Sequence, residues 1–253
     1  MYPVLPFGPF TVPTGPVIIL IATTIGLELA GRLGRRLGLA TDDVWNTGLI
    51  AILAGLIVAR LWNVFQFWPV YLAEPLLIVS LRPSGFILLP GLIAALVFGY
   101  GYLIYRELEP KSVTASLLVG VVCAWAIIEA GGMLTGQPLG TQTTVPWALH
   151  YYGEPRHPVS LYYGVSLAAL VICLWPFTPK TKPTQLILYL LLGVGIVYLV
   201  FSSFEDNTST FSTIRLKQIG GFAVALLATF MLSRITQFRN FQKPKDLGDI
   251  SDK

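Results

Sequence analysis

The chain has 253 residues, of which 54% are hydrophobic and only 12% charged, and its mean hydropathy is +0.69. This composition leaves too little polar surface to cover a soluble globule of that size, which excludes an ordinary water-soluble enzyme or binding module. The formal charge of +4 does not indicate nucleic-acid binding either, because the basic residues stand in the gaps between apolar stretches instead of forming one basic face.

The apolar stretches predict the architecture. A bilayer core about 30 Å thick requires roughly 20 apolar residues for each helical crossing. Stretches of that order, bounded by charge or proline, run from Pro16 to Gly31, Trp45 to Phe67, Gly85 to Tyr105, Ser112 to Leu134, Pro158 to Phe177, Gln185 to Phe204 and Leu216 to Leu232. The sequence therefore predicts an all-α, polytopic integral membrane protein with about seven transmembrane helices.

Charge around the first stretch predicts the orientation. No basic residue precedes it, whereas Arg32, Arg35 and Arg36 follow it, so we expect a retained span and not a cleavable signal peptide. Lysine and arginine accumulate on the cytoplasmic side of short loops, which places the N-terminus outside and the C-terminus in the cytoplasm. We expect a single membrane domain over residues 1–240 and a polar cytoplasmic tail over residues 241–253.

Acidic residues inside the stretches are the first candidates for function, because an unpaired charge in hydrocarbon is costly. Glu28 lies four residues before Arg32, and a local ion pair within one helix is the favoured interpretation. Glu129 lies deep in the fourth stretch without a basic residue one turn away, so it needs a partner from another helix. With Gly131 and Gly132 beside it, this stretch is predicted to be broken or to line a cavity.

Arg60, near the outer end of the second stretch, is the chemically sensible partner for Glu129. Two interpretations of Arg60 remain open: a paired or functional guanidinium, or a side chain that only reaches up to the interface. Cys123 and Cys173 lie inside apolar stretches and lack the spacing of metal ligands, so no metal site is predicted.

The densest polar region is the external connection GQPLGTQTTVPWALHYYGEPRHPVSLYYG. Arg156 and His157 directly precede Pro158, which suits the first turn of a helix, so they occupy a positive helix end that favours a phosphate or a carboxylate. Aromatic residues such as Trp147 beside charges are also typical of a membrane interface. We favour binding of an anion or lipid head group over this second interpretation.

Within this region RHPVSLYY resembles the R-H-P-S-Q-L-Y-E signature of prolipoprotein diacylglyceryl transferases, bacterial enzymes that move diacylglyceryl from phosphatidylglycerol to a lipobox cysteine. The longer segment PWALHYYGEPRHPVSLYY keeps the proline–tryptophan lead-in of the family. GLIVARLWNVF is similar to its GARLGYVL-type second helix, and LPGLIAAL falls where the family has HGGLIGG. The resemblance implies a multi-pass protein of the bacterial cytoplasmic membrane in lipoprotein biosynthesis, acting on phosphatidylglycerol and a lipobox prolipoprotein. The sequence has no recognised metal, nucleotide or flavin motif, so no cofactor is expected.

Several family positions carry other residues. The stretch IEAGG places Glu129 where the family has arginine and Gly132 where it has asparagine, and the essential family histidine falls on Leu89. FSSFED keeps its acids but loses the first arginine of the corresponding family pattern. Further replacements are Thr14 for tyrosine, Pro90 for glycine, Gln137 for glutamate and Tyr163 for glutamate.

The resemblance and the chemistry together imply candidate roles. A base must activate the thiol, and cations must hold the phosphate and stabilise the departing glycerol phosphate. The candidates are His157, Glu129 and Asp206 for catalysis, and Arg60, Arg156, Tyr162, Gln137 and Gly140 for substrate binding. Two hypotheses remain: a transferase with a rewired site, and a catalytically inactive lipid- or lipoprotein-binding protein on the same scaffold. A transporter is disfavoured because no internal repeat is found.

Overall fold

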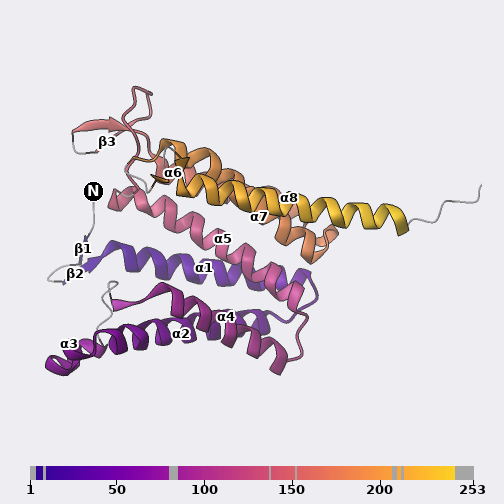
Figure 1. Ribbon diagram of the computed structural model, residues 1–253, viewed down its shortest axis with the longest axis horizontal. Coiled ribbons are helices and arrows are strands. Elements are labelled where there is room, and N and C mark those ends of the chain that lie inside the picture. Colours follow the sequence, from indigo (N-terminus) through magenta and orange to yellow (C-terminus); the bar gives the residue numbers. More distant parts are fainter. Residues whose placement is uncertain are drawn as a thin grey trace, which may run out of the picture. The chain divides into compact units, whose positions relative to one another are not determined.

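The computed structural model describes residues 4–7, 10–79, 85–136, 138–151, 153–206, 210–211 and 214–242. Among these residues, 7 helices are long and apolar enough to cross a membrane. They are α1 (Thr14–Arg36), α2 (Thr41–Gln66), α4 (Leu88–Tyr105), α5 (Pro110–Thr135), α6 (Val159–Leu174) continued by a 3-10 turn to Lys180, α7 (Pro183–Phe201) continued by a 3-10 turn to Phe204, and α8 (Leu216–Gln242), as Figure 1 shows. The predicted all-α, polytopic membrane fold is confirmed.

The helices extend beyond the apolar stretches at several ends. Helix α1 continues to Arg36 and carries Arg35 and Arg36 in its last turn, where basic side chains favour the negative end of the helix dipole. Helix α8 continues past Leu232 to Gln242. The predicted division between a membrane domain and a tail stays a prediction, because residues 243–253 lie outside the described residues.

Short elements, which hydropathy did not predict, connect the spans. Helix α3 (Trp68–Ala73) and the 3-10 turn η1 (Pro75–Val79) follow α2, and the turns η3 (Trp175–Lys180) and η4 (Ser202–Phe204) follow α6 and α7. Antiparallel hairpins pair β1 (Val4–Phe7) with β2 (Phe10–Pro13), β3 (Leu149–Tyr151) with β4 (Glu154–Arg156), and β5 (Thr210–Phe211) with β6 (Ile214–Arg215).

The predicted break in the fourth stretch is wrong, because α5 runs as one helix through Gly131 and Gly132. A glycine in a helix interior costs only about 1 kcal/mol relative to alanine, which tertiary packing readily offsets. Here Gly131 admits the side chain of Ile18 from α1, since a Cβ on Gly131 would lie 2.7 Å from Ile18 Cδ1. The glycine therefore allows close helix packing and does not end the helix.

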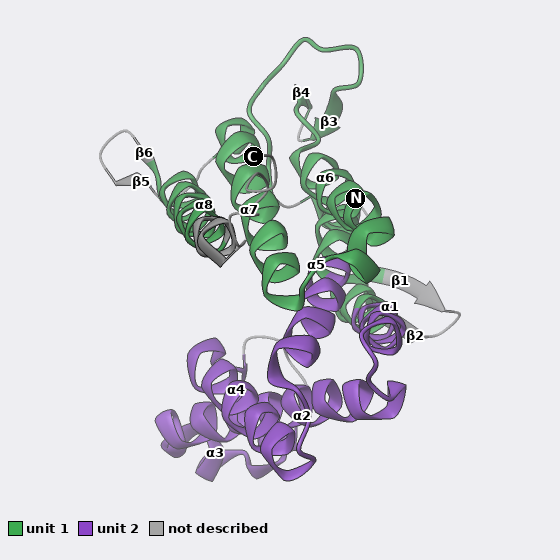
Figure 2. Ribbon diagram, turned by 90° about the vertical axis from the view of Figure 1, so that its right-hand side faces the viewer, with its two compact units in different colours: residues 1–22, 125–253 green, residues 23–124 purple. Residues whose placement is uncertain are grey.

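The chain divides into two compact units, shown in green and purple in Figure 2: unit 1 comprises residues 1–22 and 125–253, and unit 2 residues 23–124. Helices α1 and α5 each contribute to both. In unit 2, α2 packs on α4, where a Cβ on Gly91 would lie 2.8 Å from the Gly55 carbonyl oxygen. In unit 1, α7 packs on α8 through Gly195 and Gly221 in the same way. Small residues at both crossings let the backbones approach closely.

Candidate active site

The start of α6 carries the first polar cluster of unit 1, which we call the histidine cluster: Trp147, Arg156, His157, Tyr162 and Asp206. His157 is half-buried, and its Nδ1 lies 3.1 Å from the Tyr162 hydroxyl, which also accepts a 2.8 Å hydrogen bond from Trp147 Nε1. The imidazole ring lies 5.0 Å from the ring of Phe204. Tyr162 therefore holds one nitrogen of the imidazole, and the aromatic neighbours restrain its ring.

Arg156 closes the other side of the histidine cluster. Its Nη1 donates to Asp206 Oδ2 at 2.5 Å and to the Gly140 carbonyl oxygen at 2.9 Å. The Nε of Arg156 is buried and has no hydrogen-bond partner among the described residues. The guanidinium is thus partly neutralised by an acid, and part of its donor capacity remains unused.

Backbone contacts fix the histidine cluster to the end of α7. Thr141 N donates to the Phe204 carbonyl oxygen at 2.8 Å, Asp206 N to Leu139 at 2.7 Å, and His157 N to Thr141 at 3.0 Å. A Cβ on Gly140 would lie 2.0 Å from the His157 carbonyl oxygen, so only glycine fits at this position. The predicted site residue Gly140 has a clear structural role, which is to let two segments pass at van der Waals distance.

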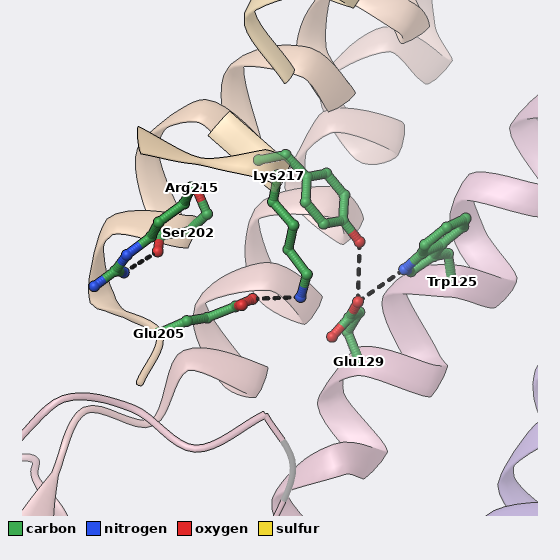
Figure 3. A network of polar contacts seen from close by, with 7 residues as sticks. Trp125, Glu129, Ser202, Glu205, Arg215 and Lys217 are labelled. Carbon is green, nitrogen blue, oxygen red and sulfur yellow. Dashed lines mark hydrogen bonds and ion pairs between the residues drawn. The ribbon is translucent and has the colours of Figure 1, made fainter. Parts of the chain in front are cut away.

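Glu129 organises a second cluster, which we call the Glu129 cluster: Trp125, Glu129, Tyr163 and Tyr198. Its Oε1 accepts hydrogen bonds from Trp125 Nε1 at 2.8 Å and from the Tyr198 hydroxyl at 2.9 Å (Figure 3). The rings of Trp125 and Tyr198 meet edge to face at 6.1 Å, and Tyr198 stacks on Tyr163 at 4.8 Å. The partner from another helix is therefore a tyrosine of α7.

A buried ion pair lies next to the Glu129 cluster. Glu205, which is 1% exposed, accepts a 2.8 Å contact from Lys217 Nζ at the start of α8 (Figure 3). The same amine lies 5.9 Å from the centre of the Tyr163 ring. Arg215 donates to the Ser202 carbonyl oxygen close by. Lys217 was not among the predicted site residues, although a lysine at the start of an apolar stretch is a signal that could have identified it.

Arg60 lies in unit 2, and its guanidinium donates hydrogen bonds to backbone carbonyl oxygens. Its Nε donates to the Ile78 carbonyl oxygen at 3.1 Å, its Nη1 to Gly85 at 2.8 Å, and its Nη2 to Leu77. These bonds tie α2 to η1 and to Gly85, which precedes α4. Arg60 is thus anchored within its own unit, and its predicted substrate contact stays a prediction.

The predicted candidates are distributed unevenly. Unit 1 holds Glu129, Gly140, Arg156, His157, Tyr162 and Asp206, and unit 2 holds Arg60. Gln137 lies outside the described residues. Leu89, which stands at the position of the family histidine, is an exposed apolar side chain on α4. The predicted ion pair of Glu28 with Arg32 is confirmed, with Nε and Oε1 2.7 Å apart.

Comparison with known proteins gives a consistent result. The family described as prolipoprotein diacylglyceryl transferase matches residues 3–234. A relative from Clostridioides difficile, named phosphatidylglycerol–prolipoprotein diacylglyceryl transferase, is 28% identical over 166 residues, which cover 66% of this chain and 67% of the relative. Proteins of the same name from Bacillus cereus and Bacillus cytotoxicus are 27% identical over 179 residues and 22% over 238 residues. The alignment with the Bacillus cereus protein covers 66% of both chains. The alignment with the Bacillus cytotoxicus protein covers 89% of this chain and 88% of the relative.

Proposed function

We propose that this chain, which belongs to the prolipoprotein diacylglyceryl transferase family, transfers a diacylglyceryl group from a phospholipid to the lipobox cysteine of a prolipoprotein. It is a multi-pass protein of the bacterial cytoplasmic membrane. Because consecutive spans alternate in direction, the clusters stand where α5 and α7 end and where α6 and α8 begin, on one face of the membrane. In the predicted orientation that face is the outer one.

The transfer defines what the site must supply. The cysteine sulfur forms a bond to the terminal glyceryl carbon of the donor, and the bond from that carbon to the phosphate oxygen breaks. The electron pair leaves with glycerol phosphate when the donor is phosphatidylglycerol, and the thiol proton goes to a base. A thiolate is the reactive nucleophile, so a base within reach of the cysteine is indispensable near neutral pH.

The single observation that carries the proposal is the arrangement of His157. Its Nδ1 is engaged by Tyr162, and Nε2 has no partner among the described residues. An imidazole held by one nitrogen and open at the other is suited to take a proton at pH 7. When Nδ1–H donates to the Tyr162 oxygen, Nε2 carries the lone pair, and the same bond persists in the imidazolium formed after proton transfer.

The carboxylates are less suitable bases. Asp206 and Glu205 are each engaged in an ion pair, with Arg156 and Lys217 respectively. Oε1 of Glu129 already accepts two hydrogen bonds, whereas Nε2 of His157 is engaged by none of the described residues. We therefore assign the base to His157 and positioning of its ring to Tyr162.

Arg156 is proposed to bind the donor phosphate. Nη1 is occupied by Asp206 and Gly140, and a guanidinium has five N–H donors, so unused donors remain for phosphate oxygens. The proposed roles of Arg60 and Gln137 in substrate binding come from the family resemblance alone.

The test is diacylglyceryl transfer from labelled phosphatidylglycerol to a lipobox peptide by the purified full-length protein. The chain has 2 histidines, so His150→Ala, on an exposed strand position, is the matched control for His157→Ala. We expect His157→Ala to lower the rate about 10²- to 10⁴-fold, the usual contribution of a general base. His150→Ala retains the rate. Equal rates for the two variants would refute the assignment of His157.

A specific observation favours the alternative of a non-catalytic binding protein. Two cations near the clusters, Arg156 and Lys217, already pair with acids, which weakens their attraction for a phosphate. This alternative predicts bound phospholipid without transfer in the wild type. Transfer by the wild type that His157→Ala abolishes would exclude it.

A further inference from the structure

We infer that Glu129, flanked by the rings of Trp125 and Tyr198, binds the ammonium group of a zwitterionic phospholipid, so that the lipid held at this site is an aminophospholipid. Ammonium binding is argued from the Glu129 cluster alone. The additional step, that this lipid is the diacylglyceryl donor, rests on the proposed function.

The first argument is the unused acceptor capacity of Glu129. Among the residues that the structure describes, its hydrogen-bond donors are Trp125 and Tyr198, and both donate to Oε1. Neither donor carries a charge, and Lys217 pairs with Glu205 instead. A carboxylate in a membrane span is costly without a cation, and Oε2 remains as an acceptor for one.

The second argument is the surroundings of that carboxylate. Trp125 is 49% exposed and lies edge to face with Tyr198, so aromatic surface flanks the acid on two sides. An ammonium group donates charge-assisted hydrogen bonds to a carboxylate, and its methylene neighbours pack on aromatic surface. A phosphate is repelled by the acid. The cluster is therefore complementary to a cation with at least one N–H donor.

The third argument selects a lipid over a peptide. At a rise of about 1.5 Å per residue, Glu129 lies about 9 Å along α5 from its last residue, Thr135. Glu129 therefore lies within the membrane-spanning part of α5, where lipid is the surrounding medium. Tyr163 stacks on Tyr198 and its ring centre lies 5.9 Å from Lys217 Nζ, but Glu205 already compensates the charge of that amine, which leaves Glu129 as the charged group that selects the lipid.

The test compares two short-chain lipids, a phosphatidylethanolamine and its N-acetyl derivative, in which an uncharged amide replaces the ammonium group. Binding is measured on the full chain in a maltoside detergent, which contains no ammonium group. We expect the wild type to bind the amine about tenfold more tightly, a difference of about 1.4 kcal/mol. Glu129→Gln should bind both lipids with the affinity of the N-acetyl derivative. Glu28→Gln, which removes an acid paired with Arg32 in unit 2, is the matched control and should retain the preference.

Equal binding of both lipids by the wild type would overturn the inference, whatever the folding of the variant. A preference that survives Glu129→Gln would also overturn it. Glu129-dependent binding of a lysine-containing lipobox peptide, without a preference between the lipids, would assign the site to the peptide and exclude the lipid.

Transfer assays separate this inference from the proposed function. Selective binding of the amine without transfer from phosphatidylethanolamine or phosphatidylglycerol would refute the transferase and leave the ammonium site in place. Transfer from phosphatidylglycerol without any selectivity for the amine would retain the transferase and refute the ammonium site. Selective binding together with faster transfer from phosphatidylethanolamine would support both.

Discussion

The buried ion pair between Glu205 and Lys217 yields the sharpest prediction on stability. Glu205 is 1% exposed, whereas the Lys217 side chain is 47% exposed, so the two partners are unequal. Lys217→Met leaves a buried carboxylate without its cation. Glu205→Gln leaves a half-exposed amine that can still donate to the amide oxygen. We expect the lysine substitution to be the more damaging.

The magnitudes follow from burial. Breaking a fully buried ion pair by removing one partner costs about 3–5 kcal/mol, and the exposure of Lys217 reduces the expected cost of Lys217→Met to about 2–3 kcal/mol. Glu205→Gln should cost about 1 kcal/mol, because a hydrogen bond to the amine is retained. The double variant should cost about 1–2 kcal/mol less than the sum of the two single variants, since contacting residues are not additive.

The assay is unfolding in mixed detergent micelles with increasing dodecyl sulfate, followed by tryptophan fluorescence, on all four members of the cycle. The control cycle uses Glu28→Gln and Arg32→Met, whose ion pair is exposed and should show much weaker coupling. A smaller cost for Lys217→Met than for Glu205→Gln would refute the argument from burial. So would a coupling energy no larger than that of the control cycle.

Two further predictions use the same assay. Gly221→Ala should lower the free energy of unfolding by about 1–3 kcal/mol, because the added Cβ would lie 2.7 Å from the Gly195 carbonyl oxygen. Gly220→Ala is the control: its added Cβ has no neighbour within 4 Å, and the substitution should stabilise the helix by up to about 1 kcal/mol. Hydrogen bonding to Ser112, first from its side chain and then from its N–H, which donates to Glu109 Oε2 at 2.5 Å, holds the pKa of Glu109 below its ordinary value. Its contribution to stability is therefore complete above the ordinary glutamate pKa and lost as pH falls through the lowered folded pKa, a dependence that Glu109→Gln should abolish.

The spans were predictable from the sequence because hydrocarbon leaves a chain few options. Backbone groups in a bilayer must be satisfied within the segment, so a long apolar stretch such as Leu216 to Leu232 becomes a helix. The same argument does not predict the structure of the segments that connect the spans. The β3–β4 hairpin and helix α3 lie outside the apolar stretches, where hydropathy carries no signal.

The partners of charged residues were harder to predict than the residues themselves. Glu129 stood out as an acid in an apolar stretch, but its partner Tyr198 comes from α7 and looks like any other aromatic residue of a span. Arg60 stood out equally, yet it donates to carbonyl oxygens, which every residue possesses. Sequence separation hides such contacts, and the resemblance helped only at the RHP segment, where His157 and Arg156 are adjacent in the chain.

The two proposals assign proton transfer to His157 and lipid selection to Glu129, and the charges around the clusters are consistent with this division. Arg156 with Asp206 and Lys217 with Glu205 form ion pairs that cancel locally. Neither His157 nor Glu129 has an ionic partner among the described residues, and each is held on one side by the hydroxyl of a tyrosine. The proposals use these open sides, with Nε2 of His157 accepting a proton and Oε2 of Glu129 binding a cation. Reversing the charge at Glu129 should therefore change which lipid is bound and leave the proton acceptor intact. Loss of His157 should remove the proton acceptor and leave the lipid preference unchanged.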